Sequence, residues 1–188
     1  MHIGLFGGSF DPPHICHSLL CFYVLEMTDV DKVLWVPCVD HAFAKVSASF
    51  EHRLAMSRLA AQALGPRVEI SDIEKMLPRP SYTINTVEAL RRQMAGARIS
   101  VLIGSDIVAE LERWQRIEDL RQQADFIIVP RGGYVSGDDE TAVALPRLSS
   151  TDIRNALRSG HSVDGFVTPA VRAYIEHHGL YREREKGQ

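Results

Sequence analysis

The stretch GLFGGSFDPPHICH, residues 4–17, decides the fold. The apolar run at residues 3–6 predicts a buried parallel strand, and Pro12-Pro13 suits the entry to a helix. Between them, Gly7-Gly8 predicts unusual backbone dihedrals and room for a ligand to approach the main chain. Ligands of open α/β sheets bind beyond the carboxyl ends of the strands, so we expect a binding site at this turn.

The same alternation of strand and helix continues along the chain. Further strands are predicted at residues 33–36, 67–71, 99–103 and 126–129. Helices are predicted at residues 15–25, 50–64 and 83–94. Strands and helices that alternate in this way form right-handed βαβ units. The sequence therefore predicts an α/β fold, a Rossmann-like open parallel sheet with helices on both faces.

The pattern changes after the last of these strands. The elements expected there are a surface loop at residues 131–139, a last short strand at 142–145, and helices at 149–158 and 169–178. Gly160 and Gly179 lie where the two helices should stop. Because no linker or repeat is visible, we expect one domain over residues 1–188, with a short helical C-terminal part at about 149–181.

Composition limits the partners. Of the 188 residues, 45% are apolar, which argues against disorder, and the net charge of −3 argues against a nucleic-acid partner. No apolar stretch approaches the roughly 20 residues of a membrane helix, so no membrane partner is expected. Three cysteines and no secretory leader indicate a cytoplasmic location. Whether the chain forms a homo-oligomer is left open.

Two histidines follow the glycine turn. His14 and His17 are three residues apart, so they share one face near the start of the helix, beside free amides and the positive end of the dipole. This placement favours a phosphate site. The alternative is a zinc site that uses Cys16, His17 and Cys21, but structural zinc needs a second pair of ligands, and none is visible. No protein-bound metal is therefore predicted.

A second helix start near the C-terminus has the same character. Ser150 and Thr151 can donate hydroxyl hydrogen bonds to phosphate oxygens, and Arg154 can bind a phosphate in a bidentate manner one turn later. The alternative is helix capping alone, with a serine as N-cap and Asp152 in the first turn. Together with the first helix start, this site could hold a triphosphate.

These two motifs, GSFDPPHxxH and SSTxIR, resemble those of the nucleotidyltransferase superfamily related to class I aminoacyl-tRNA synthetases. Within it, the chain resembles the bacterial nicotinate-nucleotide adenylyltransferases over roughly residues 3–181. Shorter segments that support the resemblance are Val36-Pro37, Arg53–Met56, Pro80–Thr86, Ile103–Asp106, Trp114, Phe166–Pro169 and Gly179–Tyr181.

The resemblance implies that nicotinate mononucleotide attacks the α-phosphorus of ATP, giving deamido-NAD and pyrophosphate, with Mg²⁺ carried by the ATP phosphates. It assigns catalysis to His14, His17 and Arg154. It assigns ATP binding to these three residues and to Gly8, Ser9, Phe10, Lys45, Asp106, Ser150 and Thr151. It assigns binding of the mononucleotide to Thr83, Asp106 and Trp114, with the Trp114 ring against the pyridine.

Two segments depart from the family pattern. The usual H-x-G-H is here His14-Ile15-Cys16-His17, and the Cys16 side chain is expected to crowd the nucleotide or slow turnover. A thiol at a helix start is also expected to have a lowered pKa. The P-P-H-K-like stretch that usually approaches ATP is here residues 37–45, in which His41 or Lys45 could take that role.

Two alternatives to this function are kept. The acceptor could be nicotinamide mononucleotide or phosphopantetheine, although Ser81-Tyr82-Thr83 and Trp114 disfavour the latter. The chain could also be a nucleotide-binding regulator that has lost catalysis, as Cys16 and the altered loop would allow. The joint presence of His14, His17 and Arg154 speaks against a mere binder, which has less need of transition-state donors.

Overall fold

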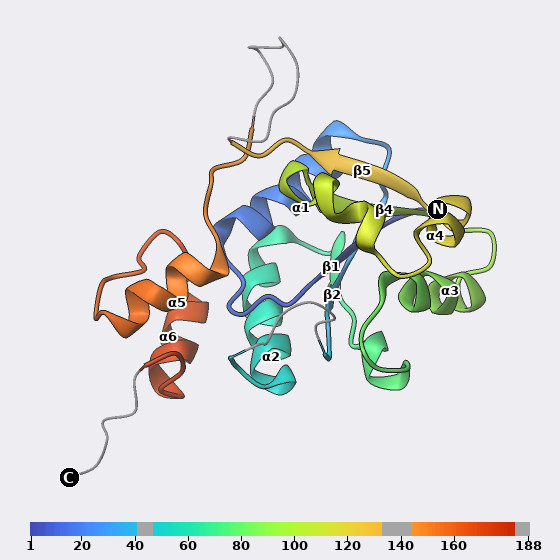
Figure 1. Ribbon diagram of the computed structural model, residues 1–188. Helices are drawn as coiled ribbons and strands as arrows, with labels where there is room; N and C mark the ends of the chain where they lie inside the picture. Colours follow the sequence, from blue (N-terminus) through green and yellow to red (C-terminus); the bar gives the residue numbers. More distant parts are fainter. Residues whose placement is uncertain (41–46, 133–143, 183–188) are drawn as a thin grey trace.

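Strand β1 (His2–Gly8) is the central strand of a sheet of five parallel strands, in the order β3-β2-β1-β4-β5 (Figure 1). Its neighbours are β2 (Lys32–Pro37) and β4 (Arg98–Gly104), and the outer strands are β3 (Val68–Ile70) and β5 (Asp125–Val129). The computed structural model describes residues 1–40, 47–132 and 144–182. The five strands predicted between residues 3 and 129 are present, and the predicted parallel sheet is confirmed; half of the short strand predicted at 142–145 lies outside the described residues.

Helices cover both faces of this sheet, as predicted. One face carries α1 (Ile15–Met27), α2 (Phe50–Ala61), α5 (Ser150–Arg158) and α6 (Pro169–His177). The other carries α3 (Thr83–Gln93) and α4 (Ile117–Gln123). The 3₁₀ segments η1 (Gln62–Leu64), η2 (Ile73–Met76) and η3 (Ser105–Arg113) complete the element order. The sequence did not predict α4, η2 or η3, because α4 and η2 are short and the three-residue period of a 3₁₀ segment such as η3 differs from that of an α-helix.

The alternation of side chains along β1 divides the core into two layers. Ile3 and Leu5 pack against α3 and α4, whereas Phe6 packs with α1, α2 and the C-terminal helices. Nearly every position of the central strands is buried, which explains why they read as continuous apolar runs. Beyond the sheet, the predicted glycine stops are confirmed, since Gly160 and Gly179 have left-handed φ values of 69° and 60°.

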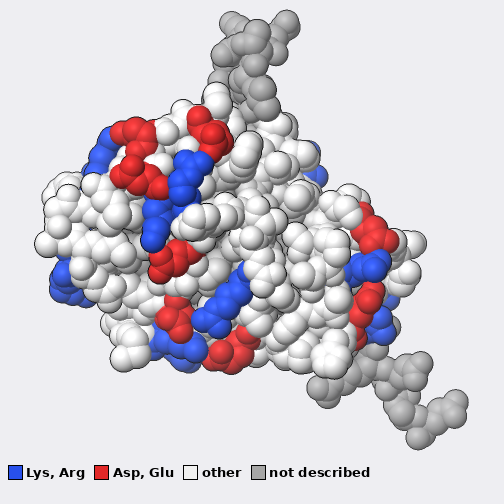
Figure 2. Space-filling view, turned by 180° about the vertical axis from the view of Figure 1, so that it is seen from behind, with Lys and Arg blue, Asp and Glu red and all other residues white. Residues whose placement is uncertain are grey.

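Charges of both signs are interspersed on the surface. On the face shown in Figure 2, basic and acidic side chains lie next to one another rather than in one large basic patch. Exposed ion pairs such as Lys32–Glu69, at 2.8 Å, and Arg172–Asp164, at 2.6 Å, are part of this mixture. The absence of a nucleic-acid partner stays a prediction. No helix among the described residues has the length and hydropathy that a membrane crossing requires.

Candidate active site

A cavity of about 330 Å³, here called the strand-end cavity, opens where β1, β4 and β5 end. The strand order reverses at β1, because the chain continues to β2 on one side and later places β4 on the other. Such a switch point is the expected ligand site of an open α/β sheet. Of the predicted site residues, those that line the cavity are Gly8, Ser9, Phe10, His14, His17, Thr83, Asp106 and Trp114.

The unusual backbone dihedral of the glycine turn lies at Phe10 rather than at the predicted Gly7-Gly8. Neither Gly7 nor Gly8 has a positive φ, whereas Phe10 does, at 48°. A Cβ at Gly8 would lie 2.9 Å from the Phe10 ring, so glycine is required there because that ring packs against the backbone. The Phe10 ring is 2% exposed and meets the His17 ring edge-on at 4.9 Å. Phe10 therefore supports a predicted catalytic histidine from the core side.

His14 and His17 lie stacked at the start of α1, with ring centroids 3.6 Å apart. The backbone amide of His14 donates to Nδ1 of His17 at 3.0 Å, so the proton of a neutral His17 is on Nε2. Burial, and then the positive charge of Arg131, lower the pKa of His14 to about 3. Burial, then His14 and Arg131, likewise hold the pKa of His17 well below its usual range. Both rings are neutral donors at neutral pH.

These lowered values predict a pH-dependent stability. In the unfolded chain each histidine returns to a pKa of about 6.5 and binds a proton that the folded chain does not. The folded state is therefore at its full stability, as far as these histidines are concerned, above about pH 6.5. It loses stability progressively as the pH falls toward about 3, because only the unfolded chain binds the protons. We expect the free energy of unfolding, measured by urea titration, to fall between about pH 7 and 5. His14→Gln should reduce this dependence of the unfolding free energy on pH. His161→Gln changes an exposed histidine and should leave it as in the wild type. Equal dependence in the wild type and both variants would contradict a neutral His14.

Arg131 is the main residue that the sequence analysis missed. The sequence predicts a surface loop from residue 131 onward. This prediction is wrong for the Arg131 side chain, which lines the strand-end cavity. Its guanidinium pairs with Asp106 at 2.6 Å and also donates to the carbonyl of Leu148. Its position one residue after the Pro130 that follows β5 was the available signal, because all strand ends meet at this edge.

Asp106 presents an unused acceptor to the same cavity. One carboxylate oxygen pairs with Arg131, while the other, Oδ1, is buried and has no hydrogen-bond partner. A Cβ on Gly104 would lie 2.3 Å from this oxygen, so glycine at the end of β4 lets the carboxylate fold back over the strand. Nδ1 of His14 is likewise buried without a partner. Both residues line the strand-end cavity, where a bound ligand could supply the partner that each of these atoms lacks.

The opposite wall of the cavity carries the residues predicted to hold the nicotinate. Thr83 is the first residue of α3 and Tyr82 precedes it, so Thr83 is not the N-cap. Trp114 is half-buried at the end of η3, with its ring centroid 6.4 Å from that of Phe126. Glu74, which the sequence analysis missed, also lines the cavity; burial raises its pKa, and it accepts a hydrogen bond from the Val39 amide at 3.1 Å.

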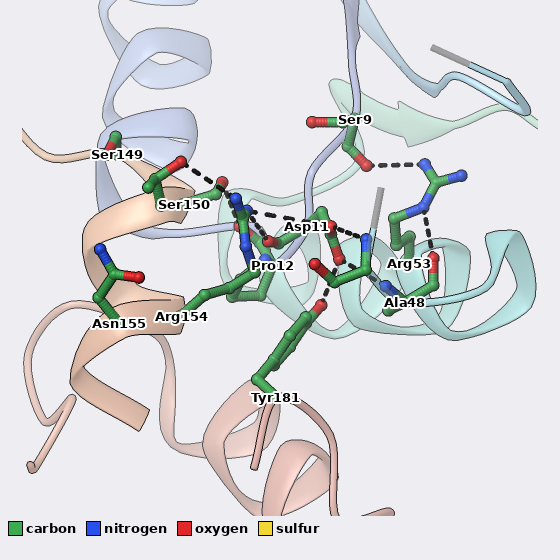
Figure 3. Close-up of polar contacts among 12 residues, drawn as sticks. Ser9, Asp11, Pro12, Ala48, Arg53, Ser149, Ser150, Arg154, Asn155 and Tyr181 are labelled. Carbon is green, nitrogen blue, oxygen red and sulfur yellow. Dashed lines mark hydrogen bonds and ion pairs between the residues drawn. The ribbon is translucent and has the colours of Figure 1, made fainter. Parts of the chain in front are cut away.

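Arg53 is a third residue whose role the sequence analysis missed, and it holds the loops beside the cavity together. Its side chain is fully buried and donates to the Ser9 carbonyl at 2.8 Å (Figure 3) and to the Cys38 carbonyl at 2.7 Å. It also reaches the Ala48 carbonyl at 3.2 Å. Five donors on one planar group allow arginine to join several chain segments at once. The predicted ATP contacts of His41 and Lys45 lie outside the described residues.

The second helix start lies beside the first but outside the cavity. Ser149 is the N-cap of α5, and Asp152 completes its capping box, so the capping interpretation is confirmed for these two residues. Ser150 donates to the Pro12 carbonyl at 2.9 Å, and Arg154 donates to the Asp11 carbonyl at 2.7 Å and to Thr151 at 3.0 Å. The two helix starts are therefore adjacent (Figure 3), but Ser150, Thr151 and Arg154 do not line the strand-end cavity. Their contacts with ATP stay predictions.

The structure contradicts the expected reactivity of Cys16. The thiol is 5% exposed, and burial raises its pKa although the Arg131 charge opposes this. Its Sγ donates to the Pro146 carbonyl at 3.5 Å, and the residue lines the cavity between the two histidines. The expectation that the side chain narrows the nucleotide site is consistent with this position.

Cys16→Gly is therefore expected to raise kcat/KM for ATP about 3- to 10-fold, since it removes atoms from the cavity wall. Glycine within a helix should also lower the stability of the protein by about 1 kcal/mol. Cys16→Ala keeps Cβ and separates the two effects, so its kcat/KM should lie between those of the other proteins. Steady-state kinetics and thermal melts check both effects; an unchanged kcat/KM in both variants would show that the thiol is accommodated without cost.

Comparison with known proteins agrees with this geometry. The family model described as cytidylyltransferase-like matches residues 5–156. A "Probable nicotinate-nucleotide adenylyltransferase" of Anaeromyxobacter dehalogenans is 39% identical over 185 residues, which cover 96% of each chain. One of Thermus thermophilus is 37% identical over 187 residues, covering 97% of this chain and 100% of the relative. The chain belongs to the nicotinate-nucleotide adenylyltransferase family.

Solved structures share the fold of this nicotinate-nucleotide adenylyltransferase family member. A nicotinic acid mononucleotide adenylyltransferase of Plasmodium falciparum, solved in complex with NaAD, has a TM-score of 0.80 and 18% identity, with 96% of this chain and 97% of that chain covered. The same protein complexed with APC has a TM-score of 0.78. At this identity the likeness shows the fold alone, whereas the relatives in the preceding paragraph show the family.

Proposed function

We propose that this chain transfers the adenylyl group of ATP to nicotinate mononucleotide, giving deamido-NAD and pyrophosphate in NAD biosynthesis. The strand-end cavity carries the proposal, because it joins two neutral histidines and a guanidinium at one end to Thr83 and Trp114 at the other. One end offers donors to phosphate oxygens and the other an aromatic ring and a hydroxyl. A nucleotide with a pyridine base matches both ends.

The proposed reaction needs no protein nucleophile. The phosphate oxygen of the mononucleotide forms a bond to the α-phosphorus of ATP, and the bond from that phosphorus to the bridging oxygen of pyrophosphate breaks. Negative charge then grows on the α-phosphate and leaving oxygens, where Nε2–H of His17 and the guanidinium of Arg131 can donate. Asp106 offers its free Oδ1 to a ribose hydroxyl. Catalysis is positioning and charge stabilisation.

Mg²⁺ enters this proposal with the substrate. The side chains at the phosphate end of the cavity are imidazoles and a guanidinium, and these do not suit a hard cation that prefers oxygen ligands. Asp106, one of the carboxylates that line the cavity, is paired with Arg131. We therefore expect Mg²⁺ to bind the ATP phosphates, where it would offset their charge. The proposed reaction requires no ion bound by protein side chains. The cytoplasmic location is proposed with the same function.

The test is pyrophosphate release by the purified protein with Mg-ATP and one acceptor at a time. Release with nicotinate mononucleotide and little with nicotinamide mononucleotide or phosphopantetheine supports the proposal. Release with a different acceptor alone would move the activity to another adenylyltransferase. ATP binding without release, measured by calorimetry, would support the regulator instead. Mass spectrometry of the product identifies deamido-NAD directly.

A further inference from the structure

The Asp11 carboxylate lies at a buried junction of segments that are far apart in the sequence (Figure 3). Asp11 is 2% exposed. Its Oδ1 accepts hydrogen bonds from the Ala48 amide at 3.0 Å and the Tyr181 hydroxyl at 2.8 Å, and its Oδ2 accepts one from the Ser47 amide at 2.6 Å. A carboxylate can be buried to this depth because these donors replace the water that it loses.

Asp11 also determines where the Arg154 guanidinium lies. Nη1 of Arg154 donates to the Asp11 carbonyl at 2.7 Å and is 3.9 Å from the Asp11 carboxylate. Nη2 donates to Thr151 at 3.0 Å, and Nε is buried without a partner. The residue that the sequence assigns to the ATP phosphates is therefore held beside the loop that leads into His14, by Asp11 on one side and Thr151 on the other.

Tyr181 closes the junction from the C-terminal end of the chain. It follows α6 in the Gly179-Leu180-Tyr181 segment and has a left-handed φ of 65°, which is uncommon for a residue other than glycine. Burial and then the Asp11 charge raise the pKa of its hydroxyl above the ordinary range, so the hydroxyl keeps its proton and donates. Neither Tyr181 nor Asp11 lines the strand-end cavity. Asp11 and Tyr181 can therefore affect the reaction only through residues that contact the substrates.

We propose that Asp11 and Tyr181 are positioning residues for the ATP triphosphate. The Tyr181 hydroxyl holds the Asp11 carboxylate, and Asp11 in turn holds Arg154 and the loop that leads into His14. The turn that follows α6 thus sets the affinity for ATP without contributing an atom to the cavity. This inference rests on the proposed function for its kinetic test, but not for its binding test.

Tyr181→Phe removes a single hydroxyl and tests this inference. We expect KM for ATP to rise about 3- to 10-fold, with KM for nicotinate mononucleotide unchanged. The matched control is Tyr174→Phe, because the Tyr174 hydroxyl makes a hydrogen bond of 3.0 Å to Nδ1 of His52 on α2 rather than to Asp11. Both variants should lose a similar amount of thermal stability, and the control should keep the wild-type KM for ATP. Equal KM values for ATP in the two variants would overturn the proposal.

A double variant tests the route through Arg154. If Tyr181 acts through that guanidinium, Tyr181→Phe should raise KM for ATP little further in an Arg154→Met background. Additive effects would overturn this route. Calorimetric titration with α,β-methylene ATP measures the same changes as affinities and requires no turnover. A wild-type protein that releases no pyrophosphate would therefore count against the proposed function alone, whereas equal ATP affinities of Tyr181→Phe and Tyr174→Phe would count against the positioning role.

Discussion

Replacing His17 by alanine is expected to lower kcat by about 10²- to 10³-fold while KM for ATP changes less than about 3-fold. The reason is the protonation pattern of the ring. Nδ1 of His17 is occupied as an acceptor of the His14 amide, so the Nε2–H of a neutral ring is the donor left for the α-phosphate. Its hydrogen bond should strengthen as charge grows in the transition state. Steady-state kinetics with ATP varied at saturating mononucleotide measure both constants.

Two further variants of His17 separate the donor from the packing of the ring, which meets Phe10 at 4.9 Å. Glutamine extends far enough to place an N–H near the position of Nε2, and should recover part of kcat. Asparagine is one carbon shorter and reaches only the position of Nδ1, so it should resemble alanine. A large rise in KM with kcat unchanged would instead assign His17 to ground-state binding of ATP.

Replacing Arg131 by glutamine is expected to lower kcat/KM for ATP by about 10²-fold. Arg131 is the cation that pairs with Asp106 at 2.6 Å and lowers the pKa of both histidines through its charge. Its removal takes one charged donor from the phosphate end of the strand-end cavity and also frees the Asp106 carboxylate to repel the triphosphate. Both changes weaken the binding of ATP and of the transition state, and initial rates at low ATP measure their sum.

The matched control for this variant is Arg98→Gln. Arg98 is also paired with carboxylates, at 2.8 Å to Asp125 and 2.9 Å to Asp29, but it lies at the start of β4, the opposite end of the sheet. Its replacement should leave kcat/KM at the wild-type value. Arg131→Lys keeps the charge without the planar group, so its kcat/KM should lie between those of the wild type and Arg131→Gln. An Arg131→Gln enzyme as active as Arg98→Gln would remove Arg131 from the proposed mechanism.

Much of this molecule can be predicted from local pattern. The buried strands are continuous apolar runs, Gly160 and Gly179 stop their helices, and the alternation of strands and helices implies a parallel sheet. Asp106, Thr83 and Trp114 line the same cavity as the histidines, but the sequence placed them at the site through its resemblance to the family. The segments α4 and η3 were not predicted, because α4 has only 7 residues and η3 follows the three-residue period of a 3₁₀ helix.

The sequence by itself therefore determined the fold, the family motifs and the edge of the sheet at which the site lies, since these follow from hydrophobic period and residue spacing. Only the tertiary structure decided which charges meet. It made Arg131 the partner of Asp106, placed Arg154 against Asp11, kept the histidines neutral and raised the pKa of the Cys16 thiol. The physical reason is that burial and charge depend on neighbours distant in the chain, which no local pattern contains.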